Sequence, residues 1–403
     1  MKTILFVCYW FPPINIIGAL RPYQQAKFLA DNGYRVIVVC AYFPKEDKVI
    51  CVEESKNLKV IRYDDNKLSS LLLPNLRGVI DNLLVRGIKF ALREMFFPDQ
   101  FVLNKRKILE LVDDVIKKEG KPSLIISSAL PFSMHTIACQ ISKKYQINWI
   151  ADHRDLWAQS PYRKRLTFLR KLDVIYERKI LSQTSYNIVI GEKMRQELEL
   201  TLQQKNIAVV RNGADVITVN NQAVLTKHEI IFSYTGILYG GFRDPSALFD
   251  AILLDDNLRK MSSFNFYGSE KNIVSQYQEN YKDLFISYYG RKDKTEIKEI
   301  QNQSHFLVIA LGNTFFEKSV LTGKFYEYLE TGRAIIALCD EDSELAILIN
   351  KYQVGVATRD TSKILKFIKS HQDNNFPLLD LPKELTRTYQ NQVLFNYVEE
   401  LSK

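Results

Sequence analysis

Residues 321–338 read LTGKFYEYLETGRAIIAL, a pattern that predicts a short helix followed by a strand. Lys324 and Glu327 are three residues apart, so in a helix both side chains lie on one face. Gly332 is typical of the position just after a helix, where the chain often turns left-handed. Residues 335–338 form an apolar run short enough for a buried strand. The stretch therefore predicts one helix–strand step of an α/β fold.

The start of this helix has the chemistry of an anion site. A helix N-terminus carries unpaired N–H groups and a partial positive charge, so it favours a phosphate, and Lys324 in the first turn would strengthen that preference. Glu327, one turn deeper, is suited to accept hydrogen bonds from the paired hydroxyls of a sugar. Together these residues predict a nucleoside diphosphate pocket. The alternative, a helix with solvated charges, stays open on this stretch alone.

The chain of 403 residues, with 46% hydrophobic and 25% charged residues, predicts a globular protein of two or three domains. No apolar run reaches about 18 residues, so no transmembrane helix is expected, and the first residues read as a strand rather than a signal peptide. The five cysteines form no CxxC pair, which indicates reduced thiols in a cytosolic protein. The net charge of +9 indicates acidic partners, namely phosphates, anionic lipid or nucleic acid.

The N-terminal segment predicts a βαβ unit with parallel strands. Residues 3–8 and 35–41 are apolar runs typical of buried strands, and a helix is predicted between them at 21–32. In parallel sheets, ligands bind beyond the carboxyl ends of the strands, where Gly18 and Arg21 would lie. Gly18 would let the backbone approach a ligand closely, and Arg21 could bind a phosphate or carboxylate. A turn glycine and a surface arginine are the alternative.

Two later strands predict a second group of functional residues. A strand at 123–128 is followed by a predicted loop that contains His135, and a strand at 148–151 runs into Asp152-His-Arg-Asp155. His135, Arg154 and Asp155 would therefore emerge at carboxyl strand ends, where α/β enzymes keep their chemistry. Four ionisable residues in a row cannot all be buried without partners, which favours a functional role. For His135 the alternative is a structural or surface role.

Residues 71–107 contain an apolar helical face with basic residues on the other side, among them Arg86, Lys89 and Arg93. A helix of this kind suits the surface of an anionic membrane. The alternative is an ordinary amphipathic helix packed on its own domain.

The second half repeats the layout of the first. A strand at 229–236 ends in Gly236, the loop Tyr239-Gly-Gly-Phe-Arg-Asp-Pro245 follows, and a helix begins at Ser246. Arg243 in this loop is placed to meet a phosphate. The poorly patterned segment 217–228 marks a domain boundary there or just before it. The chain therefore predicts a second doubly wound domain.

Five motifs in order resemble the bacterial glycosyltransferases of the family-4 type, which have the GT-B fold of two Rossmann-like doubly wound domains facing across a cleft. The motifs are Tyr9-Trp-Phe-Pro-Pro with Gly18, Arg21 and Gly33; Ala151-Asp-His-Arg-Asp-Leu-Trp157; Val210-Arg-Asn-Gly-Ala-Asp215; Tyr234 to Pro245; and Gly323 to Arg333. The resemblance implies an N-terminal acceptor-binding domain at 1–205, a nucleotide-sugar-binding domain at 206–385, and a terminal helix at 386–403 that packs back on the first domain.

The resemblance also implies roles for individual residues. Arg243 and Lys324 would hold the donor diphosphate, Glu327 the ribose, and Gly18 would lie opposite them in the cleft. The donor-binding set is Gly18, Gly236, Arg243, Arg291, Ser319, Lys324 and Glu327; the catalytic candidates are Arg154, Asp155 and His135; Arg21 is on the acceptor side. Ser319 stands where many members have a second glutamate, and Arg154 stands where many have a histidine. Because of these departures, the resemblance does not identify which residue assists catalysis.

The implied reaction is transfer of a sugar from a nucleoside diphosphate sugar to a saccharide or lipid-linked acceptor, with retention and without a metal or other cofactor. The family context implies capsule, lipopolysaccharide or exopolysaccharide assembly at the inner face of the cell membrane, with segment 71–107 on the lipid. A UDP-sugar 2-epimerase and a catalytically silent sugar-nucleotide-binding partner are the alternatives. Nucleic acid is not expected as a partner, because the basic residues are dispersed and no recognition motif is present.

Overall fold

The structure is a computed structural model, and its contacts divide the chain into two compact units. Unit 1 comprises Met1–Arg211 and Asn391–Lys403, and unit 2 comprises Asn212–Gln390. The structure describes residues 1–14, 16–43, 56–72, 91–92, 94–160, 166–216, 228–268, 270–314 and 316–403.

Unit 1 is built on a seven-stranded sheet in the order β3-β2-β1-β4-β5-β6-β7, in which every pairing is parallel. Its strands are β1 (Thr3–Val7), β2 (Arg35–Tyr42), β3 (Leu58–Asp64), β4 (Leu124–Ser128), β5 (Asn148–His153), β6 (Tyr186–Val189) and β7 (Ile207–Val209). The order reverses between β1 and β4, so this is the point at which doubly wound sheets bind ligands.

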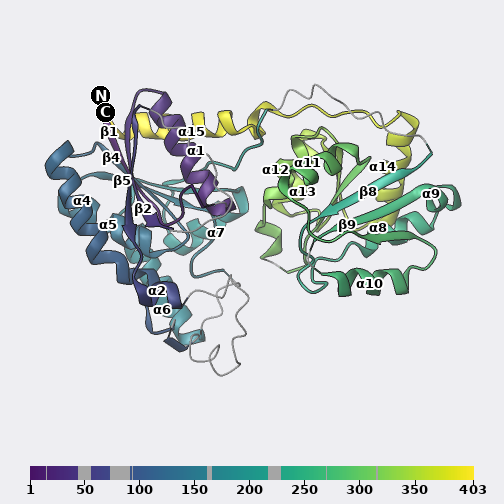
Figure 1. Cartoon of the computed structure of the whole chain (residues 1–403), viewed down its shortest axis with the longest axis horizontal. Coiled ribbons are helices and arrows are strands. Elements are labelled where there is room, and N and C mark those ends of the chain that lie inside the picture. Colours follow the sequence, from purple (N-terminus) through teal and green to yellow (C-terminus); the bar gives the residue numbers. More distant parts are fainter. Residues whose placement is uncertain are drawn as a thin grey trace. The chain divides into compact units, whose positions relative to one another are not determined.

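Helices cover both faces of this sheet (Figure 1). They are α1 (Ile17–Asp31), α2 (Lys67–Leu71), α4 (Lys105–Glu119), α5 (Ser133–Tyr145), α6 (Thr167–Leu181), α7 (Glu192–Leu202) and α15 (Arg387–Leu401), with a 3-10 turn η1 (Gln100–Asn104). Alternate residues of β1 enter opposite cores: Phe6 packs with α1 and α15, whereas Leu5 packs with α4 and α5. This two-sided burial explains why the strands are continuous apolar runs.

Unit 2 repeats the design with a six-stranded, all-parallel sheet in the order β10-β9-β8-β11-β12-β13. Its strands are β8 (Ile230–Thr235), β9 (Ser262–Tyr267), β10 (Phe285–Tyr288), β11 (Phe306–Ala310), β12 (Ala334–Leu338) and β13 (Gly355–Ala357). Its helices are α8 (Ser246–Leu253), α9 (Asp256–Met261), α10 (Lys271–Asn280), α11 (Lys294–Gln303), α12 (Gly323–Leu329), α13 (Glu344–Tyr352) and α14 (Thr361–Asp373), with 3-10 turns η2 (Glu317–Ser319) and η3 (Lys383–Leu385).

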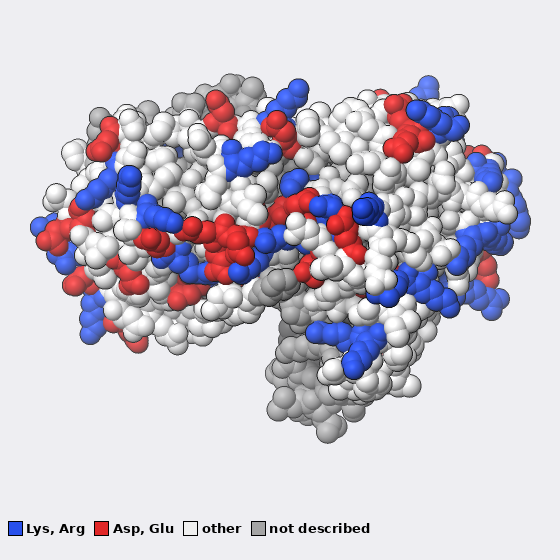
Figure 2. Space-filling view, turned by 180° about the vertical axis from the view of Figure 1, so that it is seen from behind, with Lys and Arg blue, Asp and Glu red and all other residues white. Residues whose placement is uncertain are grey.

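The core of unit 2 again has two layers. Ile336 of β12 packs toward α8, α10 and α14, and its neighbour Ile335 packs toward α12 and α13 (Figure 1). On the face drawn in Figure 2, acidic and basic side chains are interspersed on the surface of each unit. Among the described residues, no helix is long and apolar enough to cross a membrane.

The predicted α/β architecture is confirmed, and three local placements are corrected. His135 lies inside α5 rather than in a loop, because the helix begins at Ser133, two residues after Pro131. Gly18 lies in the first turn of α1, which begins earlier than predicted. The strand predicted at 148–151 extends to His153. Of the predicted membrane segment 71–107, residues 73–90 and 93 lie outside the described residues.

Candidate functional site

Glycines at the carboxyl ends of three adjacent strands form the floor of the candidate site in unit 2. Gly236 follows β8, Gly268 follows β9, and Gly290 lies two residues beyond β10. The Gly236 N–H donates to the Tyr267 carbonyl at 2.7 Å, and the Gly268 N–H donates to the Gly290 carbonyl at 2.9 Å. A Cβ on Gly268 would stand 2.1 Å from the Gly236 carbonyl oxygen. Side chains are therefore excluded where these backbones meet, so backbone polar groups line the carboxyl edge of the sheet at β8, β9 and β10.

Lys324, in the first turn of α12, lies across this glycine floor. A Cβ on Gly236 would stand 2.2 Å from both Cε and Nζ of Lys324, and the φ of Gly236 is +141°. The ammonium group lies 4.1 Å from the centre of the Tyr234 ring. Lys324 forms no ion pair or hydrogen bond with the described residues. The ammonium end of Lys324 is therefore packed against the carboxyl end of β8.

The electrostatics of Lys324 favour binding of an anion. Burial and then the nearby Arg243 lower its pKa to about 7, against the opposing effects of Glu327 and Glu270. An anion beside Nζ would restore the charged form. These interactions also place Arg243, Lys324 and Glu327 within electrostatic range of one another.

Arg243 is held by a carboxylate that the sequence analysis did not identify. Its Nε lies 3.0 Å from Oε2 of Glu317 and its Nη2 lies 3.2 Å from Oε1, and both side chains are almost completely buried. The Gly312 N–H also donates to Glu317, at 3.1 Å. The guanidinium carbon lies 4.6 Å from the centre of the Tyr239 ring. Arg243 is therefore fixed in orientation and partly neutralised.

A second acidic residue not identified from the sequence holds the glycine-rich loop after β8. The Glu270 carboxylate accepts hydrogen bonds from the N–H groups of Leu238, Tyr239 at 3.1 Å and Gly240 at 2.7 Å. The N–H groups of this loop therefore converge on one carboxylate, at a turn where Tyr239 and Gly240 both have positive φ. The sequence signal was present, since Glu270 follows the strand-ending Gly268 by two residues.

The other predicted donor residues differ in their surroundings. Glu327 is partly buried one turn beyond Lys324 and makes no hydrogen bond or ion pair with the described residues, so its carboxylate is available. The Ser319 hydroxyl is committed to the Phe316 carbonyl at 2.8 Å. Arg291 is exposed in the loop after Gly290. Beside this loop the rings of Tyr267 and Tyr289 are stacked, with centroids 5.1 Å apart and planes at 14°.

Unit 1 brings three predicted residues together at the carboxyl edge of its own sheet. A Cβ on Gly18 would stand 2.7 Å from Nη1 of Arg154, so the guanidinium packs against the glycine. The Arg154 Nε donates to the Ala129 carbonyl at 2.5 Å. Burial lowers the pKa of Arg154, which Asp155 partly opposes, and burial raises the pKa of Asp155, which Arg154 partly opposes. Asp155 forms no ion pair at contact distance among the described residues.

Arg21, predicted on the acceptor side, is occupied by structural contacts. Its Nη2 lies 2.6 Å from Oδ1 of Asp152, and both side chains are buried. It also donates to the carbonyls of Val210 at 2.9 Å and Arg211 at 3.1 Å. These contacts join α1, β5 and the chain after β7.

His135 is completely buried in a polar network within unit 1. Its Nδ1 lies 2.8 Å from the Ser127 hydroxyl, which also accepts from the Trp149 indole N–H at 2.7 Å. Its ring lies 4.6 Å from that of His153, which lies 3.1 Å from the Asn187 amide oxygen. Burial, followed by the proximity of His153, lowers the pKa of His135 well below its ordinary value. The ring has no contact with solvent and is not brought together with Arg154 by any hydrogen bond.

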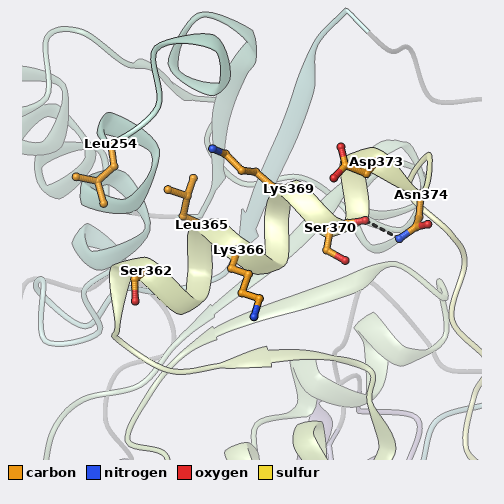
Figure 3. Close-up of a pocket in the computed structure, with 8 residues that line it drawn as sticks. All are labelled: Leu254, Ser362, Leu365, Lys366, Lys369, Ser370, Asp373 and Asn374. Atoms are coloured by element: carbon orange, nitrogen blue, oxygen red, sulfur yellow. Dashed lines mark hydrogen bonds between the residues drawn. The ribbon is translucent and has the colours of Figure 1, made fainter.

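A shallow groove of about 500 Å³ lies elsewhere in unit 2, along the outer side of α14 (Figure 3). Its lining residues are Leu254, Ser362, Leu365, Lys366, Lys369, Ser370, Asp373 and Asn374. Lys369 is paired with Asp255 at 2.6 Å, and the Asn374 amide donates to the Ser370 carbonyl. The groove carries no convergent set of reactive groups, so it is not the candidate site.

No protein-family profile matches the chain, and no curated protein matches it. Solved structures do match over the full length. The chain is similar to a sucrose-phosphate synthase from Thermosynechococcus elongatus, with 15% identity, a TM-score of 0.62, and coverage of 100% of this chain and 96% of that chain. It is also similar to the lipopolysaccharide outer core galactosyltransferase WaaB in its apo form, with 11% identity, a TM-score of 0.55, and coverage of 99% of each chain.

A third similar structure is a UDP-GlcNAc 2-epimerase from Neisseria meningitidis bound to UDP-GlcNAc, with 10% identity, a TM-score of 0.53, and coverage of 99% of this chain and 100% of that chain. At these identities the likeness defines the architecture. The chain has the GT-B fold, with a Rossmann-like sheet in each of its two units. The predicted fold class is therefore confirmed.

Proposed function

We propose that the chain is a glycosyltransferase that moves a sugar from a nucleoside diphosphate sugar to a saccharide or lipid-linked acceptor. The observation that carries the proposal is Lys324, which is packed over Gly236 at the carboxyl edge of β8 and lacks an anionic partner at contact distance among the described residues. A partly buried cation with a depressed pKa is stabilised when it binds an anion, and a diphosphate supplies one.

Each residue of the candidate site has a distinct part in this proposal. Lys324 contacts the diphosphate and regains its proton when the anion binds. Arg243, fixed by Glu317, adds positive potential to the same site. Glu327 accepts hydrogen bonds from the ribose hydroxyls. Negative charge grows on the departing diphosphate during transfer, so cations held in place beforehand stabilise the transition state more than the ground state.

Unit 1 supplies the acceptor side of the proposed enzyme. Arg154, which packs against Gly18, and the neighbouring Asp155 lie just beyond the carboxyl end of β5. We assign them to the sugar and acceptor hydroxyls. Transfer with retention, without a metal, in cell-surface polysaccharide assembly by a family-4-type enzyme is the specific form proposed. Residence at the inner face of the cell membrane belongs to the same proposal, with segment 71–107 as a membrane contact.

The proposal is tested by thermal unfolding with a panel of UDP-, GDP- and TDP-sugars. A bound donor raises the unfolding temperature, because it binds only the folded state. Glu327→Ala should abolish that protection, whereas the matched variant Glu299→Ala, at an exposed glutamate of α11, should keep it. Protection by no donor, or full protection of Glu327→Ala, contradicts the assignment.

A UDP-sugar 2-epimerase is the second candidate, favoured by the fold shared with the epimerase bound to UDP-GlcNAc. The two functions differ in product. A transferase labels an acceptor with the donor sugar and releases the nucleoside diphosphate, whereas an epimerase returns a nucleotide sugar of altered configuration. Proton NMR distinguishes the two functions when the protein is incubated with the donor that raises its unfolding temperature and with acceptor extracted from membranes. The same spectra report the anomeric configuration of the transferred sugar. Donor binding without any product identifies a silent binding partner.

A further inference from the structure

Helix α6 of unit 1 exposes an apolar face. Phe168, Leu172 and Ile175 are 62%, 50% and 65% exposed, and Leu166 just before the helix is 51% exposed. The spacing of the three helical residues, four and then three, places them on one face. Single exposed apolar residues are ordinary on protein surfaces, but several in contact mark an interaction site.

The exposed charged residues of α6 are all basic, namely Lys171, Arg178 and Lys179. Both acids, Asp173 and Glu177, are buried on the inner side, where Glu177 accepts from the Ala158 N–H at 3.3 Å. Lys171 and Lys179 are exposed on the same side of the helix as the apolar residues. A solvated surface helix commonly exposes both acidic and basic residues. Because α6 buries its acids and exposes its bases beside apolar residues, its exposed face favours an anionic, partly apolar partner.

The surroundings of α6 extend the same chemistry. The ring of Phe97 packs on Tyr176 of α6, with centroids 4.8 Å apart. Met95, two residues before Phe97, is 77% exposed. At the lower end of unit 1, where Figure 1 places α6, the face drawn in Figure 2 presents Lys, Arg and uncharged residues among the described ones.

We propose that α6 is a docking face through which unit 1 rests on a bilayer that contains anionic lipid. Phe168, Leu172 and Ile175 enter the boundary between headgroups and acyl chains, and Lys171 and Lys179 lie among the lipid phosphates. Apolar burial and charge attraction then act together, which is the requirement for stable attachment of an interfacial helix. This inference does not depend on the proposed sugar transfer.

Sedimentation with lipid vesicles tests the proposal on the full-length protein. We expect binding to vesicles of equal parts phosphatidylcholine and phosphatidylglycerol, weak binding to phosphatidylcholine alone, and release by salt. Phe168→Asp with Ile175→Asp should lower partitioning to the anionic vesicles at least tenfold, and Lys171→Gln with Lys179→Gln should lower it severalfold. Leu254→Asp, at a 63% exposed leucine of unit 2, is the matched control and should bind as the wild type does.

Three results overturn the proposal: binding by the Phe168→Asp/Ile175→Asp variant at the wild-type level, equal loss of binding in Leu254→Asp, or no wild-type binding to anionic vesicles. A wild-type dimer that Ile175→Asp converts to a monomer, without lipid binding, would instead assign the face to a second copy of the chain. Thermal unfolding of each variant confirms that a loss of binding is not a loss of fold. The rise in unfolding temperature with a nucleotide sugar is measured on the same variants. It tests the proposed function independently, because loss of lipid binding with retained donor binding contradicts this inference alone.

Discussion

Replacing Gly236 by alanine is the most specific perturbation of the candidate site. The new Cβ would stand 2.2 Å from Cε and Nζ of Lys324, so the end of the lysine side chain must move away from the carboxyl edge of β8. Because this is the flexible end of a long side chain, the clash itself costs little stability. The φ of +141° adds backbone strain of about 1–3 kcal/mol. We therefore expect a folded protein with a lower unfolding temperature and a misplaced lysine.

The loss of donor affinity follows from the contact that Lys324 would make. A hydrogen bond from a charged donor contributes about 1.5–3 kcal/mol, and about 1.4 kcal/mol corresponds to a factor of ten in affinity. Gly236→Ala should therefore weaken binding by roughly tenfold to a hundredfold. Titration calorimetry with the donor that gives the largest thermal shift measures the change.

A double-mutant cycle separates this explanation from general damage. Lys324→Met should weaken donor binding by a similar factor, and Gly236→Ala should have little further effect in the Lys324→Met background, because both changes remove the same contact. Two results refute the reasoning: wild-type affinity in Gly236→Ala, or fully additive losses in the double variant.

Three further predictions concern ionisable groups. Lys324 has a pKa of about 7 in the free protein, so affinity for a nucleotide sugar should fall as pH rises above about 7, and calorimetry should find this dependence absent in Lys324→Met. Burial lowers the pKa of His153 from 6.5 to about 4, so between pH 6.5 and 4 the unfolded state binds more protons than the folded state. Lowering the pH through this range should therefore remove up to about 3 kcal/mol of folding stability. Chemical denaturation of His153→Gln should show a weaker dependence of stability on pH. Glu317→Ala removes the carboxylate paired with Arg243 and should cost about 3–5 kcal/mol, a fall in unfolding temperature of roughly 10 °C by calorimetry; an unchanged temperature would contradict the pairing.

Most strands were predictable from the sequence because they are buried on both faces, whereas β3 (Leu58–Asp64) was not predicted, because its apolar residues alternate with charged ones and most are only partly buried. Strands such as Phe306–Ala310 are uninterrupted apolar runs, and their carboxyl ends are marked by glycines such as Gly236 and Gly268. Helices were less visible: α13 and α14 were not predicted, because their apolar residues are interspersed with polar residues and no strong glycine or proline signal bounds them. His135 was assigned to the loop after the strand at 123–128, yet the helix begins at Ser133, two residues before it.

The sequence predicted which residues belong to the candidate site better than it predicted the contacts that those residues make. Lys324 and Glu327 follow from local spacing, since both lie on one short helix. The contact of Arg243 with Glu317 joins residues 74 positions apart, and that of Arg21 with Asp152 joins residues 131 positions apart. Only the fold brings such partners together. The sequence predicted that Arg21 could bind a phosphate or carboxylate, and in the structure the carboxylate of Asp152 pairs with it.

A crystal structure of the protein with bound UDP tests the central claim most directly. We expect the diphosphate at the carboxyl edge of β8, with Lys324 Nζ within about 3 Å of a phosphate oxygen and the Glu327 carboxylate on the ribose hydroxyls. A nucleotide bound away from this edge, or bound here while Lys324 stays on the Tyr234 ring without touching a phosphate, would contradict this claim.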